Sequence, residues 1–131
     1  MQKIFLLFSG ISGALAVMLG ALGAHSLQEL ITVEQLQSYE TGVRYQMFHT
    51  LAIVLVVLLY DKLQSKHLKY AVWLFVIGII LFSGSIYLLS TQDITGLNLS
   101  SYLWPVTPLG GIFFVIGWLF IFTAAWKMSP K

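Results

Sequence analysis

Four long apolar runs divide the charged residues of this chain into two alternating groups. The lysines lie before the first run, between the second and third, and after the fourth: Lys3, Lys62, Lys66, Lys69, Lys127 and Lys131. The other two connecting segments hold most of the acidic residues and the single arginine: Glu29, Glu34, Glu40, Asp93 and Arg44. Segments rich in Lys and Arg stay on the cytoplasmic side of multi-pass membrane proteins. The alternation therefore predicts four spans, with the N-terminus and the C-terminus in the cytoplasm.

The composition excludes an ordinary soluble domain. Only 9% of the residues are charged and 58% are hydrophobic, whereas soluble domains carry roughly 25% charged residues. The formal net charge of +2 comes from lysines spread over membrane-flanking segments, so we expect no nucleic-acid partner. The chain has no cysteine, which excludes disulfides, thiolate metal sites and a cysteine nucleophile.

The length of each run fits a membrane-spanning helix, which needs about 20 apolar residues. The expected spans are 4–24, 43–60, 70–90 and 108–126. The first run is longer than the core of a signal peptide, about 7–15 residues, so we expect it to remain as a span. The chain 1–131 is thus predicted to be a single domain, an all-α integral four-helix bundle of the plasma membrane.

Two sequence signals predict where helices begin. Thr32 and Gln35 have the spacing of a capping box, so an amphipathic outer segment is expected to start near Val33, ahead of the second span. Gly42 then marks either a bend or a packing contact. Thr107-Pro108 combines a capping hydroxyl with a proline at the first helical position, which predicts the start of the fourth span.

Small residues recur at helical spacing in the first and fourth spans. They form two stripes: Ser9, Gly13, Ala16, Gly20 and Ala24 in the first, and Gly110, Gly117 and Ala124 in the fourth. Small side chains let the backbones of neighbouring helices approach closely. We expect both stripes to pack against other helices, within the chain or between copies in a homo-oligomer.

The polar motifs gather in the outer half of the predicted bilayer. At about 1.5 Å per residue, His49 lies roughly 16 Å from the inner edge of its span. Ser83 and Ser85 lie about 20 Å or more from the inner edge of theirs. The motifs that enter from the outer side are His25, Arg44, Tyr45, Gln46, Thr107, Gly110 and Gly111. This asymmetry favours a pocket open to the outer face over a through-going pore.

His49 allows two interpretations. An ionisable residue within a span usually faces the protein interior and often serves function, here as a proton carrier, a ligand or a head-group contact. Alternatively, a neutral His49 bonds Tyr45 or the segment 83–85 and sets the helix register. His25 and His49 together supply two nitrogen ligands for a metal or haem, but no third ligand is evident, so no cofactor is expected.

The remaining polar residues give no catalytic pattern. Ser83, Ser85 and His49 lack a buried acidic residue that would complete a triad, so an enzyme is not expected. Arg44 either pairs with Glu40 and contacts lipid phosphate or binds an anionic substrate. The amides at 108–111 are open to an anion, although helix initiation and close packing account for these residues more simply.

Four motifs resemble a known family. They are Gly20-Ala21-Leu22-Gly23-Ala24-His25, Tyr45-Gln46-Met47-Phe48-His49, Phe82-Ser83-Gly84-Ser85-Ile86-Tyr87 and Thr107-Pro108-Leu109-Gly110-Gly111. In this order they are similar to those of small four-helix bacterial membrane proteins of unknown function, which have mitochondrial relatives in eukaryotes. Leu22 stands where that pattern usually has Phe. The resemblance implies a four-span plasma-membrane protein and no established activity.

These observations lead to one main functional prediction and two alternatives. We expect a non-enzymatic binding or accessory protein, with an outer-half polar pocket around His49, Arg44, Ser83 and Ser85 for a lipid head group or small ligand. Membrane lipid, a second copy and a larger membrane complex are the expected partners. The first alternative is a small transporter or channel component with His49 as a protonatable gate. The second is metal or haem binding through His25 and His49.

Overall fold

The protein is described by a computed structural model that covers residues 2–128, so Lys131, the last lysine of the charge pattern, lies outside the described residues. Every regular element of this range is helical. The elements are α1 (Gln2–His25), η1 (Leu27–Glu29), α2 (Val33–Leu63), α3 (Lys66–Gly78), η2 (Ile79–Ser83), α4 (Gly84–Ser90), α5 (Gln92–Thr95), α6 (Ser100–Leu103) and α7 (Val106–Trp126). η1 is a 3-10 turn, and η2 is a π-helix.

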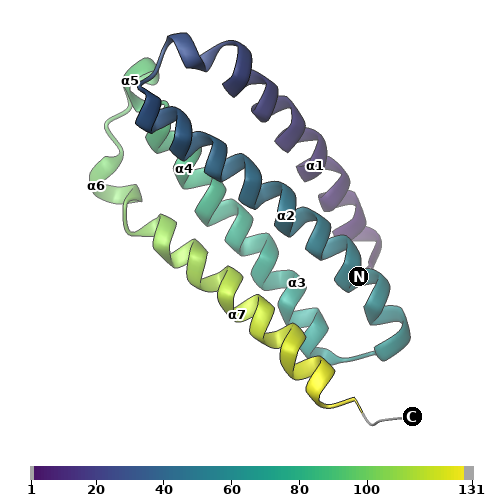
Figure 1. Ribbon diagram of the computed structural model, residues 1–131. Coiled ribbons are helices and arrows are strands. Elements are labelled where there is room, and N and C mark those ends of the chain that lie inside the picture. Colours follow the sequence, from purple (N-terminus) through teal and green to yellow (C-terminus); the bar gives the residue numbers. More distant parts are fainter. Residues whose placement is uncertain (1, 129–131) are drawn as a thin grey trace.

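Four helical segments are long and apolar enough to cross a membrane, which confirms the predicted all-α, four-span fold. They are α1, α2, the continuous run α3–η2–α4, and α7 with the short α6 before it. The start of α1, the α2–α3 turn and the end of α7 lie at one end of the bundle, which we call the lysine end (Figure 1). The turn η1 and the helices α5 and α6 lie at the other, which we call the acidic end.

The spans pack in chain order across the bundle. α1 packs on α2, α2 packs on α3 and α4, and α3 packs most extensively on α7. α1 and α7 therefore lie on opposite sides of the central pair (Figure 1). The two outer spans are less buried than the two central spans, so much of their apolar surface is left for lipid.

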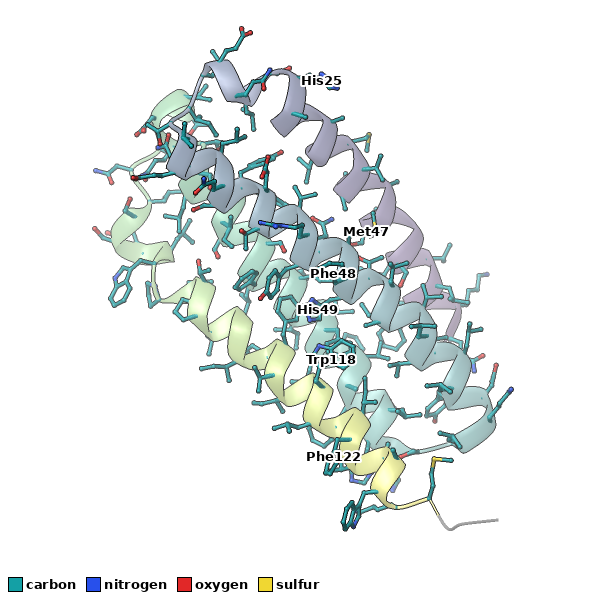
Figure 2. The ribbon with its side chains drawn as sticks, in the orientation of Figure 1. His25, Met47, Phe48, His49, Trp118 and Phe122 are labelled. Carbon is teal, nitrogen blue, oxygen red and sulfur yellow. The ribbon has the colours of Figure 1, made fainter. Side chains whose placement is uncertain are left out.

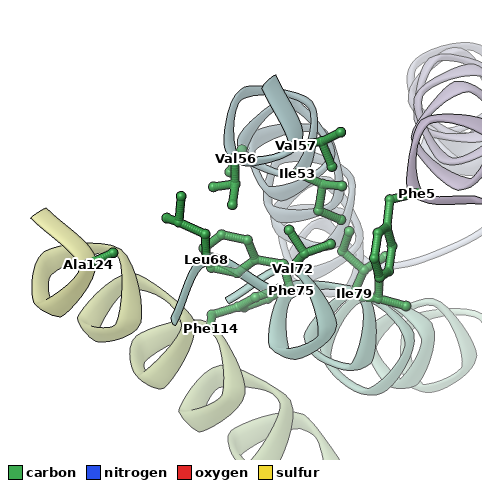
Figure 3. Close-up of a cluster of buried hydrophobic side chains, with 12 residues drawn as sticks. Phe5, Ile53, Val56, Val57, Leu68, Val72, Phe75, Ile79, Phe114 and Ala124 are labelled. Carbon is green, nitrogen blue, oxygen red and sulfur yellow. The ribbon is translucent and has the colours of Figure 1, made fainter. Parts of the chain in front are cut away.

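The hydrophobic core lies where α2, α3 and α7 meet (Figure 3). Ile53 of α2 and Phe75 of α3 are fully buried, and Phe114 of α7 is 3% exposed. Phe5 brings the start of α1 to the same cluster and stacks edge-on against Trp73, with ring centroids 5.1 Å apart. The four spans thus share one continuous hydrophobic core.

Glycines bring α7 close to the third span. A Cβ on Gly110 would lie 2.4 Å from the backbone nitrogen of Phe82, and one on Gly117 would lie 2.6 Å from the ring of Phe75. Ala124 continues this face and is also buried. The small-residue stripe of the fourth span is therefore used inside the chain, against α3 and η2.

The small-residue stripe of the first span also packs within the chain, but the prediction that Ala24 belongs to it is wrong. Ser9 and Ala16 are buried, whereas Ala24 is exposed. Gly23 takes its place and contacts the ring of Tyr39 on α2. The contact moves by one residue because an α-helix has 3.6 residues per turn, so a strict four-residue spacing drifts around the helix.

The capping box of α2 is confirmed. Thr32 Oγ1 accepts a hydrogen bond from Gln35 N at 3.2 Å, and Thr32 N donates to Gln35 Oε1 at 2.9 Å. The predicted amphipathic segment and the second span form one uninterrupted helix. Gly42 is therefore a packing contact rather than a bend, and its Cα faces the side chains of Ile86 and Tyr87.

The predicted start of the fourth span is wrong by two residues. α7 begins at Val106, with Pro105 in the capping position, and Thr107 is not the cap. Pro108 is tolerated because the amides of the first helical turn have no acceptor within the helix. The Thr107 hydroxyl is instead used in a contact with α4.

Candidate functional site

His49 is buried in the middle of α2, with 5% of its surface exposed. Its Nδ1 lies 2.8 Å from the carbonyl oxygen of Tyr45, and Trp118 Nε1 donates to its Nε2 at 3.2 Å. An indole N–H can only donate, so Nε2 is the acceptor and Nδ1 carries the hydrogen. These contacts therefore require the neutral Nδ1–H form of His49.

Aromatic rings surround His49 between α2 and α7 (Figure 2). The His49 ring stacks on Phe114, with centroids 3.5 Å apart and 12° between the planes. Phe75 and Trp118 lie at 5.3 and 6.1 Å from it. A ring packed in this way has no open side for water or a ligand to approach.

The structural interpretation of His49 predicted a bond to Tyr45 or to the segment 83–85, and the Tyr45 carbonyl is the partner. Trp118 was not predicted as the second partner. It lies near the middle of α7 and is half exposed, and no motif in the sequence connects it with His49. Only the relative placement of α2 and α7 reveals the contact.

A second buried polar cluster joins α1, α2 and α4. Gln46 Nε2 donates to the Ser12 carbonyl at 2.9 Å, and the Tyr87 hydroxyl donates to Gln46 Oε1 at 2.7 Å. The hydroxyls of Ser12 and Thr50 lie 2.7 Å apart. Gln46 was a predicted site residue, but Ser12, Thr50 and Tyr87 were missed because single hydroxyls in apolar runs carry no recognisable spacing.

The π-helix η2 positions the serines of the third span. Ser83 is fully buried, and its Oγ donates to the carbonyl of Gly42 on α2 at 2.8 Å. Ser85 Oγ lies 2.6 Å from Thr107 Oγ1 on α7 and also donates to the Phe82 carbonyl. The two serines thus connect the third span to different neighbours.

A groove with both polar and apolar walls opens at the acidic end among α2, α4 and α7. Its volume is about 490 Å³. The residues that line this acidic-end groove are Glu34, Gln35, Ser38 and Thr41 of α2, Ile86, Leu89 and Ser90 of α4, and Thr107 of α7. Gln35 is held in place by Asp93, whose Oδ2 accepts from Gln35 Nε2 at 2.6 Å. Because α2 is helical through this region, its lining residues recur on one face.

The predicted site residues do not form a single pocket. Thr107 lines the acidic-end groove, and Ser85 forms a hydrogen bond with the Thr107 hydroxyl. Arg44 reaches the groove wall by donating from Nη2 to Thr41 Oγ1 at 3.2 Å, rather than pairing with Glu40 as predicted. His49 belongs to the aromatic cluster deeper in the bundle.

The remaining candidates have packing or surface positions. Tyr45 lies between the groove and His49, with its ring 4.7 Å from that of Phe82. Gly110 packs against the Phe82 backbone, whereas a Cβ on Gly111 would lie 3.8 Å from the Phe82 ring. His25 is exposed at the end of α1, away from His49 (Figure 2). Among residues 2–128, no group of three or more His, Cys, Asp or Glu side chains is placed to hold a metal ion.

Comparison with known proteins identifies the family. Residues 19–111 match a family described as a protein of unknown function (DUF423). The chain belongs to the DUF423 family. The matched range includes all four motifs on which the family resemblance was based.

Relatives in the DUF423 family cover almost the whole chain. The UPF0382 membrane protein YwdK of Bacillus subtilis is 44% identical over 127 residues, which are 96% of this chain and 98% of the relative. The UPF0382 inner membrane protein YgdD of Escherichia coli is 34% identical over 131 residues, with 99% and 95% of the two chains covered. No solved structure gives a significant match. These relatives, with the four apolar helices, identify the chain as a membrane protein.

Proposed function

We propose that this protein is a non-enzymatic binding or accessory protein of the plasma membrane. Its binding site is the acidic-end groove, and its ligand is a lipid head group or a small polar molecule. The observation that carries this proposal is the groove itself, a space of about 490 Å³ that combines six polar side chains with the apolar Ile86 and Leu89. Ligand sites commonly have this combination of an apolar surface and a few convergent polar groups.

The groove chemistry supports a ligand that forms several hydrogen bonds. Ser38, Thr41, Ser90 and Thr107 provide hydroxyls, a group that can both donate and accept. Those of Thr41 and Thr107 already bond Arg44 and Ser85, which fixes their positions in the groove wall. Glu34 adds the only charged side chain among the lining residues. In the orientation predicted from the lysines, with both termini cytoplasmic, the groove faces the outer leaflet, where lipid head groups would reach it.

The contacts of His49 favour a structural role over a protonatable gate. Both ring nitrogens have partners, and a charged His49 would turn Nε2 from an acceptor into a donor that faces the Trp118 N–H. The aromatic cluster also lies between the groove and the lysine end, and a transporter would need a polar route there. Metal or haem binding gains no support, because His25 and His49 do not approach each other (Figure 2).

The serines likewise favour binding over catalysis. A nucleophile needs a hydrogen-bonded general base. Ser83 Oγ contacts the Gly42 carbonyl, and Ser85 Oγ contacts Thr107 and the Phe82 carbonyl. Neither contact provides a base, which supports the expectation of a non-enzymatic protein.

The proposal is tested by filling the groove. Full-length protein is extracted from bacterial membranes in mild detergent, and co-purified lipids and small molecules are measured by native mass spectrometry. Ser38→Trp should reduce the bound species about tenfold, which corresponds to about 1.4 kcal/mol. Gln37→Trp is the matched control, because Gln37 is exposed on the same helical turn but does not line the groove. Equal binding by both variants would contradict the proposal.

A further inference from the structure

An apolar groove of about 220 Å³ lies at the opposite end of the molecule, between α3 and α7. The residues that line this lysine-end groove are His67, Ile116, Leu119, Phe120, Thr123 and Lys127. Ile116, Leu119 and Phe120 make its walls aliphatic and aromatic. His67 and Lys127 carry nitrogen and lie nearest the helix ends, and we call this part of the groove its mouth. None of the proposed functions above uses this groove.

The two nitrogens at the mouth converge from different helices. Lys127 Nζ lies 3.3 Å from His67 Nε2, although Lys127 follows the end of α7 and His67 is in the first turn of α3. Lys66 and Lys69 add two more positive charges to that first turn. Asp61 is a carboxylate at this end of the chain, but it accepts a hydrogen bond from Gln2 of α1. The groove therefore combines apolar walls with a positively charged mouth.

The mouth lies at the depth expected for lipid head groups. Trp126 is 79% exposed and directly precedes Lys127, and Tyr70 is 52% exposed beside Phe120. Exposed Trp and Tyr near helix ends mark the membrane interface. Apolar walls that run from this level into the membrane match an acyl chain, and cations at this level match a phosphate.

We propose that the lysine-end groove binds one anionic phospholipid of the inner leaflet. Lys127 and His67 contact the phosphate, and one acyl chain lies along Ile116, Leu119 and Phe120. Basic pockets between helices on the cytoplasmic side are known to bind anionic head groups. The charge of the mouth selects an anionic lipid over a zwitterionic one, and the apolar walls select a lipid over free phosphate.

The N-terminus of α3 adds to the attraction for an anion. Ser65 precedes the helix and makes no side-chain capping bond. The first amides of an uncapped helix keep their hydrogens available, and the helix dipole favours an anion there. This contribution is secondary to the lysine and the groove, which define the position of the lipid.

The test measures lipid binding to full-length protein that has been delipidated in detergent. Phosphatidylglycerol is titrated and the bound fraction is followed by native mass spectrometry, with phosphatidylcholine and glycerol phosphate as separate arms. One lysine near the membrane surface contributes about 1 kcal/mol, so Lys127→Gln should weaken phosphatidylglycerol binding about fivefold. Lys62→Gln is the control, because it removes a lysine at the same end, outside the groove, and should change binding by less than about twofold.

A second variant tests the groove apart from its charge. Thr123→Phe fills the space beside Phe120 without changing a charged residue, and it should reduce phosphatidylglycerol binding at least as much as Lys127→Gln. Circular dichroism and gel filtration check that each variant is folded. Unchanged binding in Thr123→Phe, equal loss in Lys62→Gln, or equal binding of glycerol phosphate would overturn the proposal. The proposal would also be overturned if these variants changed the oligomeric state without changing lipid binding, because the groove would then hold a second copy of the chain.

Discussion

The α1–α2 and α3–α7 interfaces are both lined by glycine, yet they are built in different ways. At α3–α7, a Cβ on Gly78 or Gly117 would lie 2.5 or 2.6 Å from a phenylalanine ring. In the middle of α1–α2, a Cβ on Gly13 or Gly20 would lie 3.7 or 3.4 Å from its nearest neighbour. Hydrogen bonds from Gln46 and Thr50 to α1 supply the specific contacts there.

This difference shows that a glycine stripe does not indicate one kind of packing. Water does not drive helices together inside a bilayer, so association depends on close packing and on hydrogen bonds. The α3–α7 interface uses close packing, with Phe75 and Phe114 fitted against glycines of the partner helix. The α1–α2 interface uses hydrogen bonds and leaves more space around Gly13 and Gly20 in its middle. The two should therefore respond differently to the same substitution.

The largest effect is expected for Gly110→Ala. The new Cβ would meet the Phe82 backbone at 2.4 Å, and a backbone cannot turn aside as a side chain can, so about 3 kcal/mol of unfolding free energy should be lost. Gly111→Ala is the adjacent control, because its nearest neighbours are Phe82 ring atoms at 3.8 Å. Denaturing-detergent titrations of both variants measure the difference. Equal stability of the two would show that α7 and η2 are not in contact as described.

A smaller loss is expected for Gly117→Ala. Its Cβ would lie 2.6 Å from the Phe75 ring, which can move only by disturbing the core, so we expect a loss of about 2 kcal/mol. Gly10→Ala tests a glycine with no atom within 4 Å of the added Cβ and should have little effect. The same unfolding titration applies, and a neutral Gly117→Ala would remove the distinction between the two interfaces.

The hydrogen-bonded interface should be broken most effectively at Gln46. Gln46→Leu keeps the side-chain volume but removes the bonds to Ser12 and Tyr87. Hydrogen bonds between membrane helices contribute modestly, so the expected loss is about 1 kcal/mol. Tyr87→Phe alone and the double variant complete a cycle, and strictly additive losses in that cycle would contradict a direct Gln46–Tyr87 contact.

The smallest effect is expected for Gly13→Ala. The added methyl would contact Thr50 Cγ2 at 3.7 Å, an ordinary van der Waals distance. The free energy of unfolding should stay within about 0.5 kcal/mol of the starting protein. A loss as large as that of Gly117→Ala in the same titration would mean that the α1–α2 interface is as tight as α3–α7.

The sequence allowed the spans to be predicted because membrane helices follow simple rules of length and charge. The capping box at Thr32 also predicted the true start of α2. At Thr107-Pro108 the same kind of signal failed, since Pro105 lies close enough to start the helix earlier. Local signals cannot decide at which of two nearby prolines, Pro105 or Pro108, the helix begins.

The site was less predictable because its contacts join residues far apart in the chain. Trp118 and His49 meet only through the packing of α7 against the central spans. Glu34, Ser38 and Ser90 line the acidic-end groove, but they were not predicted as site residues because isolated polar residues near helix ends form no recognisable motif. The depth argument centred the predicted pocket on His49, whereas His49 is packed among aromatic rings and the acidic-end groove lies nearer the helix ends.

The π-helix η2 explains why the acidic-end groove opens between α4 and α7. A π turn contains one more residue than an α turn, and one residue rotates the following helix by about 100°. Before η2, the third span packs mainly on α7; after it, α4 packs mainly on α2. The third span thus turns away from α7 and leaves the space that the acidic-end groove occupies. The proposed binding site is in this sense encoded by a residue count in 79–83, so a deletion there is expected to close the groove without altering any residue that lines it.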